Sequence, residues 1–115
     1  MLNKDITSLM GILEAIENIE KYISPFSKAD DFFQNKVNYD AAMMNFIIIG
    51  EMVDRLSSQT KEKYNYIDWG KIKGVRNLIA HDYFGVDAEE IWQIAKSHIN
   101  KLKRDILRIL DDLNS

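Results

Sequence analysis

The feature that most constrains the fold is the helical spacing of apolar residues along most of the chain. Apolar side chains recur at steps of three and four residues, which places them on one face of an α-helix. No segment shows the strict alternation of apolar and polar residues that a half-buried strand requires. The spacing predicts an all-α fold, an antiparallel bundle of four main helices with short extra helical turns. The predicted helices cover approximately residues 5–23, 38–57, 69–84 and 88–113.

Capping residues and the single proline set the predicted ends of these helices. Pro25 stops the first helix, because proline lacks the amide hydrogen that a helix interior uses. Ser27 is expected to cap a short turn that follows. Asp68 is expected to cap the third helix, and Gly85 to end it. Asp87 opens the last helix with a capping-box pattern.

Length and composition indicate one domain, residues 1–115, in solution. A chain of 115 residues can bury one core but not two. Its most apolar stretch, residues 41–50, is far shorter than the roughly 20 residues that span a bilayer, so no membrane partner is expected. The amino terminus lacks the pattern of a secretory signal, which favours a cytoplasmic location. Because the net charge is −3, any RNA binding must come from a local patch and not from overall charge.

The sequence offers no recognisable metal or cofactor site. Cysteine is absent, which excludes disulfides, thiolate ligands and a cysteine nucleophile. The two histidines, His81 and His98, are 17 positions apart, a spacing that matches no zinc motif. We therefore expect neither a metal nor a cofactor. His98 falls on the apolar stripe of the last predicted helix, where a histidine of the core or of an interface is expected.

The segment from Arg76 to Tyr83 carries most of the chemistry in the chain. Within eight residues it contains an always-charged guanidinium, an amide, an imidazole and a phenol. Imidazole is the side chain that titrates near neutral pH without perturbation. The segment lies in a predicted helix, so these groups are held on a rigid element. Together they could bind or cleave a phosphodiester without a metal.

Helical geometry separates the apolar from the polar side chains of this segment. At about 100° per residue, four apolar side chains are expected to face the core: Ile72, Val75, Leu78 and Ile79. The polar side chains point away from them, and Asn77 and His81 share one face. Arg76 and His81 diverge by about 140°, which aims them poorly at a single phosphate. Either the helix ends near His81, or a second copy of the chain completes the site.

Gly50 and Glu51 interrupt the apolar centre of the second predicted helix. A glycine costs about 1 kcal/mol relative to alanine in a helix, so the close approach of another helix is expected there. A carboxylate on an apolar helix needs a partner, and Arg76 is a candidate. The alternative is that Glu51 marks a polar spot at a dimer interface.

The Arg-x4-His spacing with a tyrosine two residues later resembles the HEPN superfamily. More narrowly, the chain resembles the HepT-like toxins that are encoded beside minimal nucleotidyltransferases. Further shared features are Ile49-Gly50-Glu51, Trp69 at the start of the motif helix, Phe84-Gly85-Val86-Asp87 and Trp92. The resemblance covers nearly the whole chain.

The resemblance implies an all-helical homodimer that acts as a metal-independent endoribonuclease on RNA such as tRNA or mRNA. It implies that Arg76 and His81 are catalytic, and that Tyr83 accepts AMP from a cognate nucleotidyltransferase antitoxin in a type VII-like toxin–antitoxin pair. Supporting roles are expected for Asn77, beside the arginine, for Asp82, before the tyrosine, and for Lys73, on a basic rim.

The chemistry expected of such a site is transesterification of RNA. His81 would take the proton of the ribose 2′-hydroxyl or deliver one to the 5′-oxygen that leaves. Arg76 would neutralise charge on the phosphorane oxygens with its two-pronged guanidinium. The alternative function is a non-catalytic module that binds a nucleotide or assists a nucleotidyltransferase, because a phosphate clamp serves binding as well as bond cleavage.

Overall fold

The structure, a computed structural model, describes residues 2–114. In these residues it contains helices and no strand, which confirms the all-α prediction, and all four predicted main helices are present. The elements are α1 (Leu2–Ile23), α2 (Ala29–Gln34), α3 (Lys36–Arg55), α4 (Ser58–Lys63), α5 (Trp69–His81), the 3-10 turn η1 (Tyr83–Gly85), α6 (Ala88–Gln93), the π-helical turn η2 (Ile94–His98) and α7 (Ile99–Leu113). Of these, α6, η2 and α7 follow one another without a break and form the fourth main helix.

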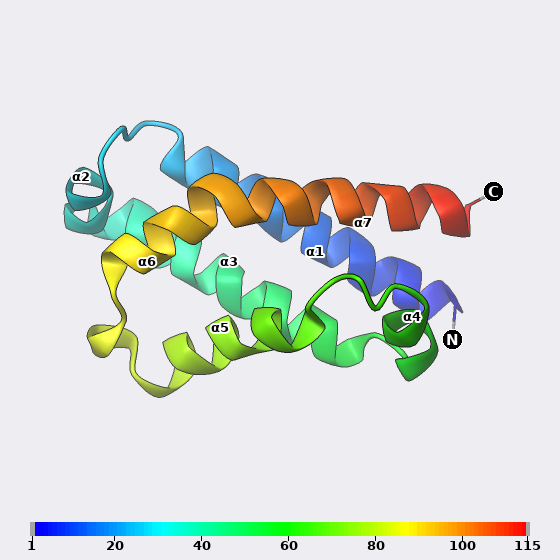
Figure 1. Ribbon diagram of the computed structural model, residues 1–115. Helices are drawn as coiled ribbons and strands as arrows, with labels where there is room; N and C mark the ends of the chain where they lie inside the picture. Colours follow the sequence, from blue (N-terminus) through cyan, green and yellow to red (C-terminus); the bar gives the residue numbers. More distant parts are fainter. Residues whose placement is uncertain (1, 115) are drawn as a thin grey trace.

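The long helices run alternately up and down the bundle (Figure 1). Helix α1 packs along α3, and α7 lies across α1. Helix α5 packs on the opposite flank of α3 and, apart from the η1 turn that follows it, makes few contacts with other elements. The motif helix is therefore the least enclosed of the four long helices.

The buried apolar side chains form one continuous core between α1, α3 and the last helix. The spacing that predicted these helices also predicted which of their faces is buried. Fully enclosed members of this core are Leu9, Ile12, Ile16, Ile19, Met43, Ile106 and Ile109. Burial of this apolar area, at about 25 cal/mol for each Å² removed from water, is the main force that holds the bundle together.

Two of the predicted caps are confirmed and one is wrong. The carboxylate of Asp68 accepts the backbone N–H of Lys71 at 2.9 Å, and the carboxylate of Asp87 accepts that of Glu89 at 3.0 Å. Helix α2 instead begins after Lys28, which makes no side-chain cap bond, so Ser27 is not its cap.

The motif helix ends at His81, three residues before the predicted end at residue 84, which confirms the alternative of a helix that ends near His81. Asp82 leaves the helical conformation, with φ −149° and ψ 70°, while its backbone N–H still bonds to the carbonyl of Leu78. The Asp82 carboxylate then accepts the N–H of Gly85 at 3.1 Å and closes the η1 turn. An aspartate that caps a tight turn therefore overrides continuation of the helix.

The prediction that four apolar residues of α5 face the core is only partly right. Ile79 is buried, Ile72 and Val75 are half-buried, and Leu78 is 44% exposed, so its assignment to the core is wrong. The reason is that α5 packs on α3 alone. Between α5 and the last helix lies an open, mostly apolar groove of about 160 Å³.

His98 lies beside this groove and is exposed, so it is not a histidine of the core, and the alternative, a histidine of an interface, stays a prediction. The π-helical turn that contains it adds a residue to one turn of the last helix and shifts the faces that follow. Among residues 2–114, no helix has the combined length and apolar character needed to cross a membrane.

Candidate functional site

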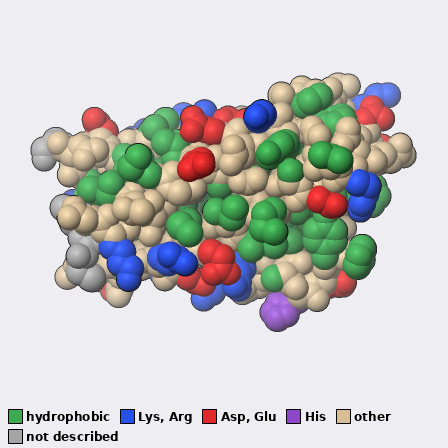
Figure 2. Space-filling model, turned by 180° about the vertical axis from the view of Figure 1, so that it is seen from behind, with side chains coloured by type: hydrophobic (Ala, Val, Ile, Leu, Met, Phe, Trp, Pro, Cys, Tyr) green, Lys and Arg blue, Asp and Glu red, His purple; other side chains and the backbone are tan. Residues whose placement is uncertain are grey.

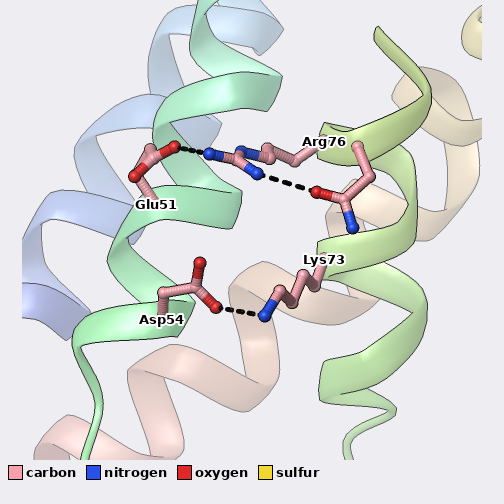
Figure 3. Close-up of polar contacts among 5 residues, drawn as sticks. Glu51, Asp54, Lys73 and Arg76 are labelled. Atoms are coloured by element: carbon pink, nitrogen blue, oxygen red, sulfur yellow. Dashed lines mark hydrogen bonds and ion pairs between the residues drawn. The ribbon is translucent and has the colours of Figure 1, made fainter. Parts of the chain in front are cut away.

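The site is built on α5, at its contact with α3. Two cationic side chains of α5, Lys73 and Arg76, reach across to two carboxylates of α3 (Figure 3). Residues three apart on a helix lie about one turn apart on the same face, so the two pairs form neighbouring rungs between the helices. The predicted partnership of Arg76 with Glu51 is confirmed.

Arg76 is held at both ends of its guanidinium. Its Nη2 donates to Oε1 of Glu51 in a short contact, and its Nη1 donates to Oδ1 of Asn77 at 2.8 Å. The Nε of Arg76 is buried and has no hydrogen-bond acceptor among the described residues. Because the side chain is still 28% exposed, the guanidinium remains accessible to a ligand from solvent.

Gly50 makes the approach of Arg76 possible. A Cβ atom added at Gly50 would lie 2.3 Å from Cβ and 2.5 Å from Cγ of Arg76, distances that non-bonded carbon atoms do not adopt. The predicted close approach of another helix at this glycine is therefore what the structure shows. The stem of the arginine passes over the backbone of α3 at this one point.

The remaining supporting residues have structural partners. The Nζ of Lys73 lies 3.1 Å from the Asp54 carboxylate, in a pair whose two side chains are largely exposed. The carboxamide of Asn77 accepts a hydrogen bond from Arg76, and no hydrogen bond among residues 2–114 joins it to an imidazole. Asp82 caps the turn after α5.

Unlike the guanidinium of Arg76, the imidazole of His81 is not held in place by neighbouring side chains. It is the last residue of α5, its side chain is exposed, and no hydrogen bond or ion pair ties the imidazole to the described residues. Because His81 is still helical, the divergence of about 140° from Arg76 applies. One chain therefore does not aim both groups at one point.

Tyr83, in the η1 turn, points back to α3. Its hydroxyl donates to the Asp40 carboxylate in a short contact, and its ring meets that of Tyr39 edge to face at 6.1 Å between centroids. Burial, the hydrogen bond to Asp40 and the charge of Asp40 together raise the pKa of the Tyr83 phenol well above its usual value of 10.0. The phenol is therefore protonated, and the hydrogen-bond donor in this contact, at neutral pH.

A second apolar stripe on α3 faces away from the core. At about 100° per residue it lies opposite the buried face of the helix. Val37 is 78% and Met44 56% exposed, while Ala41 and Ile48 are half-buried on the same line. The next position on this line is Glu51, so the stripe leads directly to the residue that holds Arg76. Seen from behind, hydrophobic side chains gather in a band across the molecule (Figure 2).

Sequence reasoning missed Asp40, Asp54 and the outward stripe. Each of these carboxylates meets a residue of the motif region that is far away in sequence, and neither has a local pattern that marks it. The stripe could have been found from its helical spacing, because its residues from Val37 to Ile48 follow at steps of four, three and four. It was missed because the buried face of the same helix has more apolar residues. Among residues 2–114, no group of three histidine, aspartate or glutamate side chains is placed to hold a metal ion.

Comparisons with known proteins find one matching family and several relatives. The family described as "Ribonuclease HepT-like" matches residues 12–109, which contain every residue of the site described above. Over 98% of its length the chain is 39% identical to a Methanocaldococcus jannaschii protein named "Gamma-glutamylcyclotransferase and putative RNase", and spans about half (51%) of that relative. No solved structure matches the chain.

Two further relatives are matched over most of their own length. A protein of the same archaeon named "Putative RNase" is 31% identical over 98% of this chain and 93% of the relative. A Thermococcus cleftensis protein named "Probable ribonuclease HepT" is 33% identical over 83% of this chain and 86% of the relative. The chain therefore belongs to the HepT-like ribonuclease family.

Proposed function

We propose that this protein is a metal-independent endoribonuclease in which Arg76 binds the scissile phosphate and His81 transfers protons. The observation that carries the proposal is the guanidinium of Arg76, held by Glu51 and Asn77 and still part of a side chain that is 28% exposed, on the same helix as an unrestrained imidazole. Membership of a ribonuclease family makes an RNA phosphodiester the natural ligand for this pair.

The proposed reaction is an in-line transesterification. The ribose 2′-oxygen attacks the phosphorus atom while the bond from phosphorus to the 5′-oxygen breaks. An imidazole removes the 2′-hydroxyl proton, and an imidazolium supplies the proton that the leaving 5′-oxygen needs. Arg76 stabilises the charge that develops on the phosphorane oxygens. The products are a 2′,3′-cyclic phosphate and a free 5′-hydroxyl.

We propose that a second copy of the chain completes the site and that it docks on the outward stripe of α3. Support comes from the divergence of Arg76 and His81 within one chain and from the exposure of Val37 and Met44. Large apolar side chains exposed along one line typically mark a protein–protein contact. Because Glu51 continues the stripe, a partner seated there would bring its own motif helix close to this one, so that two histidines share the acid and base roles.

The proposed regulation is that of a type VII-like toxin, silenced by a cognate nucleotidyltransferase that adds AMP to Tyr83. The phenol is half-buried but carries its hydroxyl on the side of Asp40, which is exposed. An added phosphodiester would bring negative charge next to the motif helix and compete with RNA for its cationic face. We place the protein in the cytoplasm, where tRNA and mRNA are found.

The proposal is tested by incubating the pure protein with tRNA and with mRNA in the presence of EDTA. Cleavage by the wild type, with 2′,3′-cyclic phosphate ends, is expected, and its loss in Arg76→Ala and His81→Ala. RNA binding without cleavage by the wild type would instead favour the non-catalytic module. Equal cleavage by folded His81→Ala protein would refute the assignment of the histidine.

AMP transfer has a separate test. The protein is expressed together with its neighbouring nucleotidyltransferase and analysed by mass spectrometry. AMP is expected on Tyr83, and AMP found only on another residue would overturn the assignment.

A further inference from the structure

The Arg76 guanidinium is the most restrained cation of the motif helix. It donates hydrogen bonds to Glu51 of α3 (Figure 3) and to Asn77 of its own helix. The stem of Arg76 lies against the backbone of α3 at Gly50. The three contacts are independent of one another, and none of them involves a ligand. An arginine that served only as an exposed surface charge would not require a glycine opposite its stem.

The neighbouring ion pair, Lys73 with Asp54, is an ordinary surface ion pair between the same two helices. Lys73 meets Asp54 at 3.1 Å across the same two helices, one turn away. Lys73 is 49% exposed, against 28% for Arg76, and its stem does not rest on a glycine. The two carboxylates, Asp54 at 36% and Glu51 at 43%, are similarly exposed. An exposed pair of this kind contributes little to stability, about 0–1 kcal/mol. If Glu51 only tied α5 to α3, its removal should have no more effect than the removal of Asp54.

We propose that Glu51 is a positioning residue, which sets the orientation of the Arg76 guanidinium before RNA binds. This proposal rests on the proposed ribonuclease function. An arginine side chain has several rotatable bonds, and a guanidinium that is already oriented needs no reorganisation when charge develops on the phosphate. The carboxylate holds the Nη2 end of the guanidinium, and the part of the Arg76 side chain that is still exposed is left for the substrate.

The charge of Glu51 acts against the affinity for RNA while its hydrogen bond favours catalysis. A carboxylate beside Arg76 offsets the attraction of the guanidinium for a phosphate. The two effects can be separated, because glutamine keeps a hydrogen-bond acceptor at the same place and removes the charge. Orientation is expressed in kcat, and charge balance is expressed in KM.

The kinetic test compares three variants with the wild type: Glu51→Ala, Glu51→Gln and Asp54→Ala. We expect kcat to fall roughly 10- to 100-fold in Glu51→Ala, the effect of a misplaced catalytic group. In Glu51→Gln, kcat should stay within about threefold and KM should fall, while Asp54→Ala should leave kcat unchanged. An unchanged kcat in Glu51→Ala, an equal loss in Glu51→Gln, or an equal loss in Asp54→Ala would overturn the proposal.

A second measurement does not depend on cleavage. In NMR spectra of the free protein, the Nε–H of Arg76 should show restricted motion in the wild type and in Asp54→Ala, and faster motion in Glu51→Ala. Circular dichroism of each variant shows whether the bundle is intact. Should the wild type bind RNA without cleaving it, the ribonuclease proposal fails, and the NMR comparison still tests the orienting role. Equal mobility of Arg76 in the wild type and in folded Glu51→Ala would contradict that role.

Discussion

The two groups on which the proposed chemistry depends occupy opposite kinds of surroundings. Arg76 lies in the middle of α5, where a glycine, a carboxylate and an amide fix its position. His81 lies at the end of the same helix, exposed, with no hydrogen bond or ion pair to the rest of the described chain. One chain therefore orients the cation and leaves the imidazole free.

The contrast between these two residues shows which part of the site is complete in a single chain. A phosphate-binding cation gains from being oriented in advance, because electrostatic stabilisation depends on where the charge is placed. A proton-transfer group must lie within hydrogen-bond reach of the reacting oxygen, and none of residues 2–114 holds His81 there by a hydrogen bond or an ion pair. In this account the second copy of the chain supplies what is missing.

The largest expected effect comes from removal of the imidazole. His81→Ala should reduce cleavage roughly 100- to 10,000-fold, the usual range for a general acid or base. Its melting temperature should stay close to that of the wild type, because the side chain is exposed and makes no hydrogen bond to the part of the chain that the structure describes. His98→Ala, at the other histidine and also exposed, is the matched control and should keep full activity. Equal losses in both variants would mean that the effect is not specific to the motif.

A smaller loss of cleavage activity is expected when residue 76 keeps its positive charge but no longer carries a planar guanidinium. Arg76→Lys places a single ammonium where the guanidinium contacts both Glu51 and Asn77, so the bidentate geometry is lost. Cleavage should fall roughly 10- to 1,000-fold, with RNA binding less affected. Gel-shift and cleavage assays on the same samples would separate the two, and full activity of the lysine variant would show that charge alone suffices.

The close contact between the Arg76 stem and Gly50 can be tested by measuring the free energy of unfolding. Gly50→Ala should destabilise the protein by about 1–3 kcal/mol, because the added Cβ collides with the Arg76 stem and pushes α5 away from α3. Gly74→Ala, two residues from Arg76 on α5, is the control. Nothing lies within 4 Å of a Cβ at that position, so the substitution should stabilise the helix by about 0.5–1 kcal/mol. Urea unfolding measures both, and equal changes would contradict the close approach.

The smallest effect on activity is expected at a polar cluster of the scaffold. The buried Asp5 carboxylate accepts the N–H and hydroxyl of Ser57, at 2.9 and 2.6 Å, and the hydroxyl of Thr60 at 2.6 Å. Burial alone would raise the Asp5 pKa, but these hydrogen bonds outweigh it and lower the pKa below 3.8.

The sign of the pH dependence follows from that lowered pKa. The stabilisation is present above the unfolded-state value of 3.8 and is lost as the pH falls through the lower folded-state pKa. Thermal melts should therefore show stability declining in this acidic range, and the decline should be weaker in Asp5→Asn. At neutral pH the variant should lose about 1–3 kcal/mol and keep its cleavage rate per folded molecule. An identical acid profile in both proteins would remove Asp5 as the cause.

Periodicity was sufficient to predict the four long helices and most of the core, because burial of an apolar face imposes its spacing on the sequence. It failed where a helix is enclosed on one side only. Leu78 has the spacing of a core residue, yet no neighbouring helix covers it. The helix end near residue 84 was placed three residues too late, because Asp82 acts as a turn cap, while the alternative of an end near His81 is confirmed.

The site was predictable in its composition and only partly in its contacts. The pairing of Arg76 with Glu51 followed from the need to satisfy a carboxylate on an apolar helix. The contacts of Asp40 with Tyr83 and of Asp54 with Lys73 depend on how α3 and α5 are aligned, which no local pattern encodes. The outward stripe was missed because the buried apolar face of α3 dominates the apolar pattern of that segment.

The most direct test of the account is the activity of a protein that can no longer pair through the α3 stripe. Met44→Asp places a charge on an exposed residue of that stripe, and Leu107→Asp places one on an exposed residue of α7. Sedimentation and RNA cleavage are measured on both and on the wild type. The account predicts a folded, inactive monomer for Met44→Asp and an active dimer for Leu107→Asp and the wild type. A folded Met44→Asp monomer that cleaves RNA at the wild-type rate would contradict it.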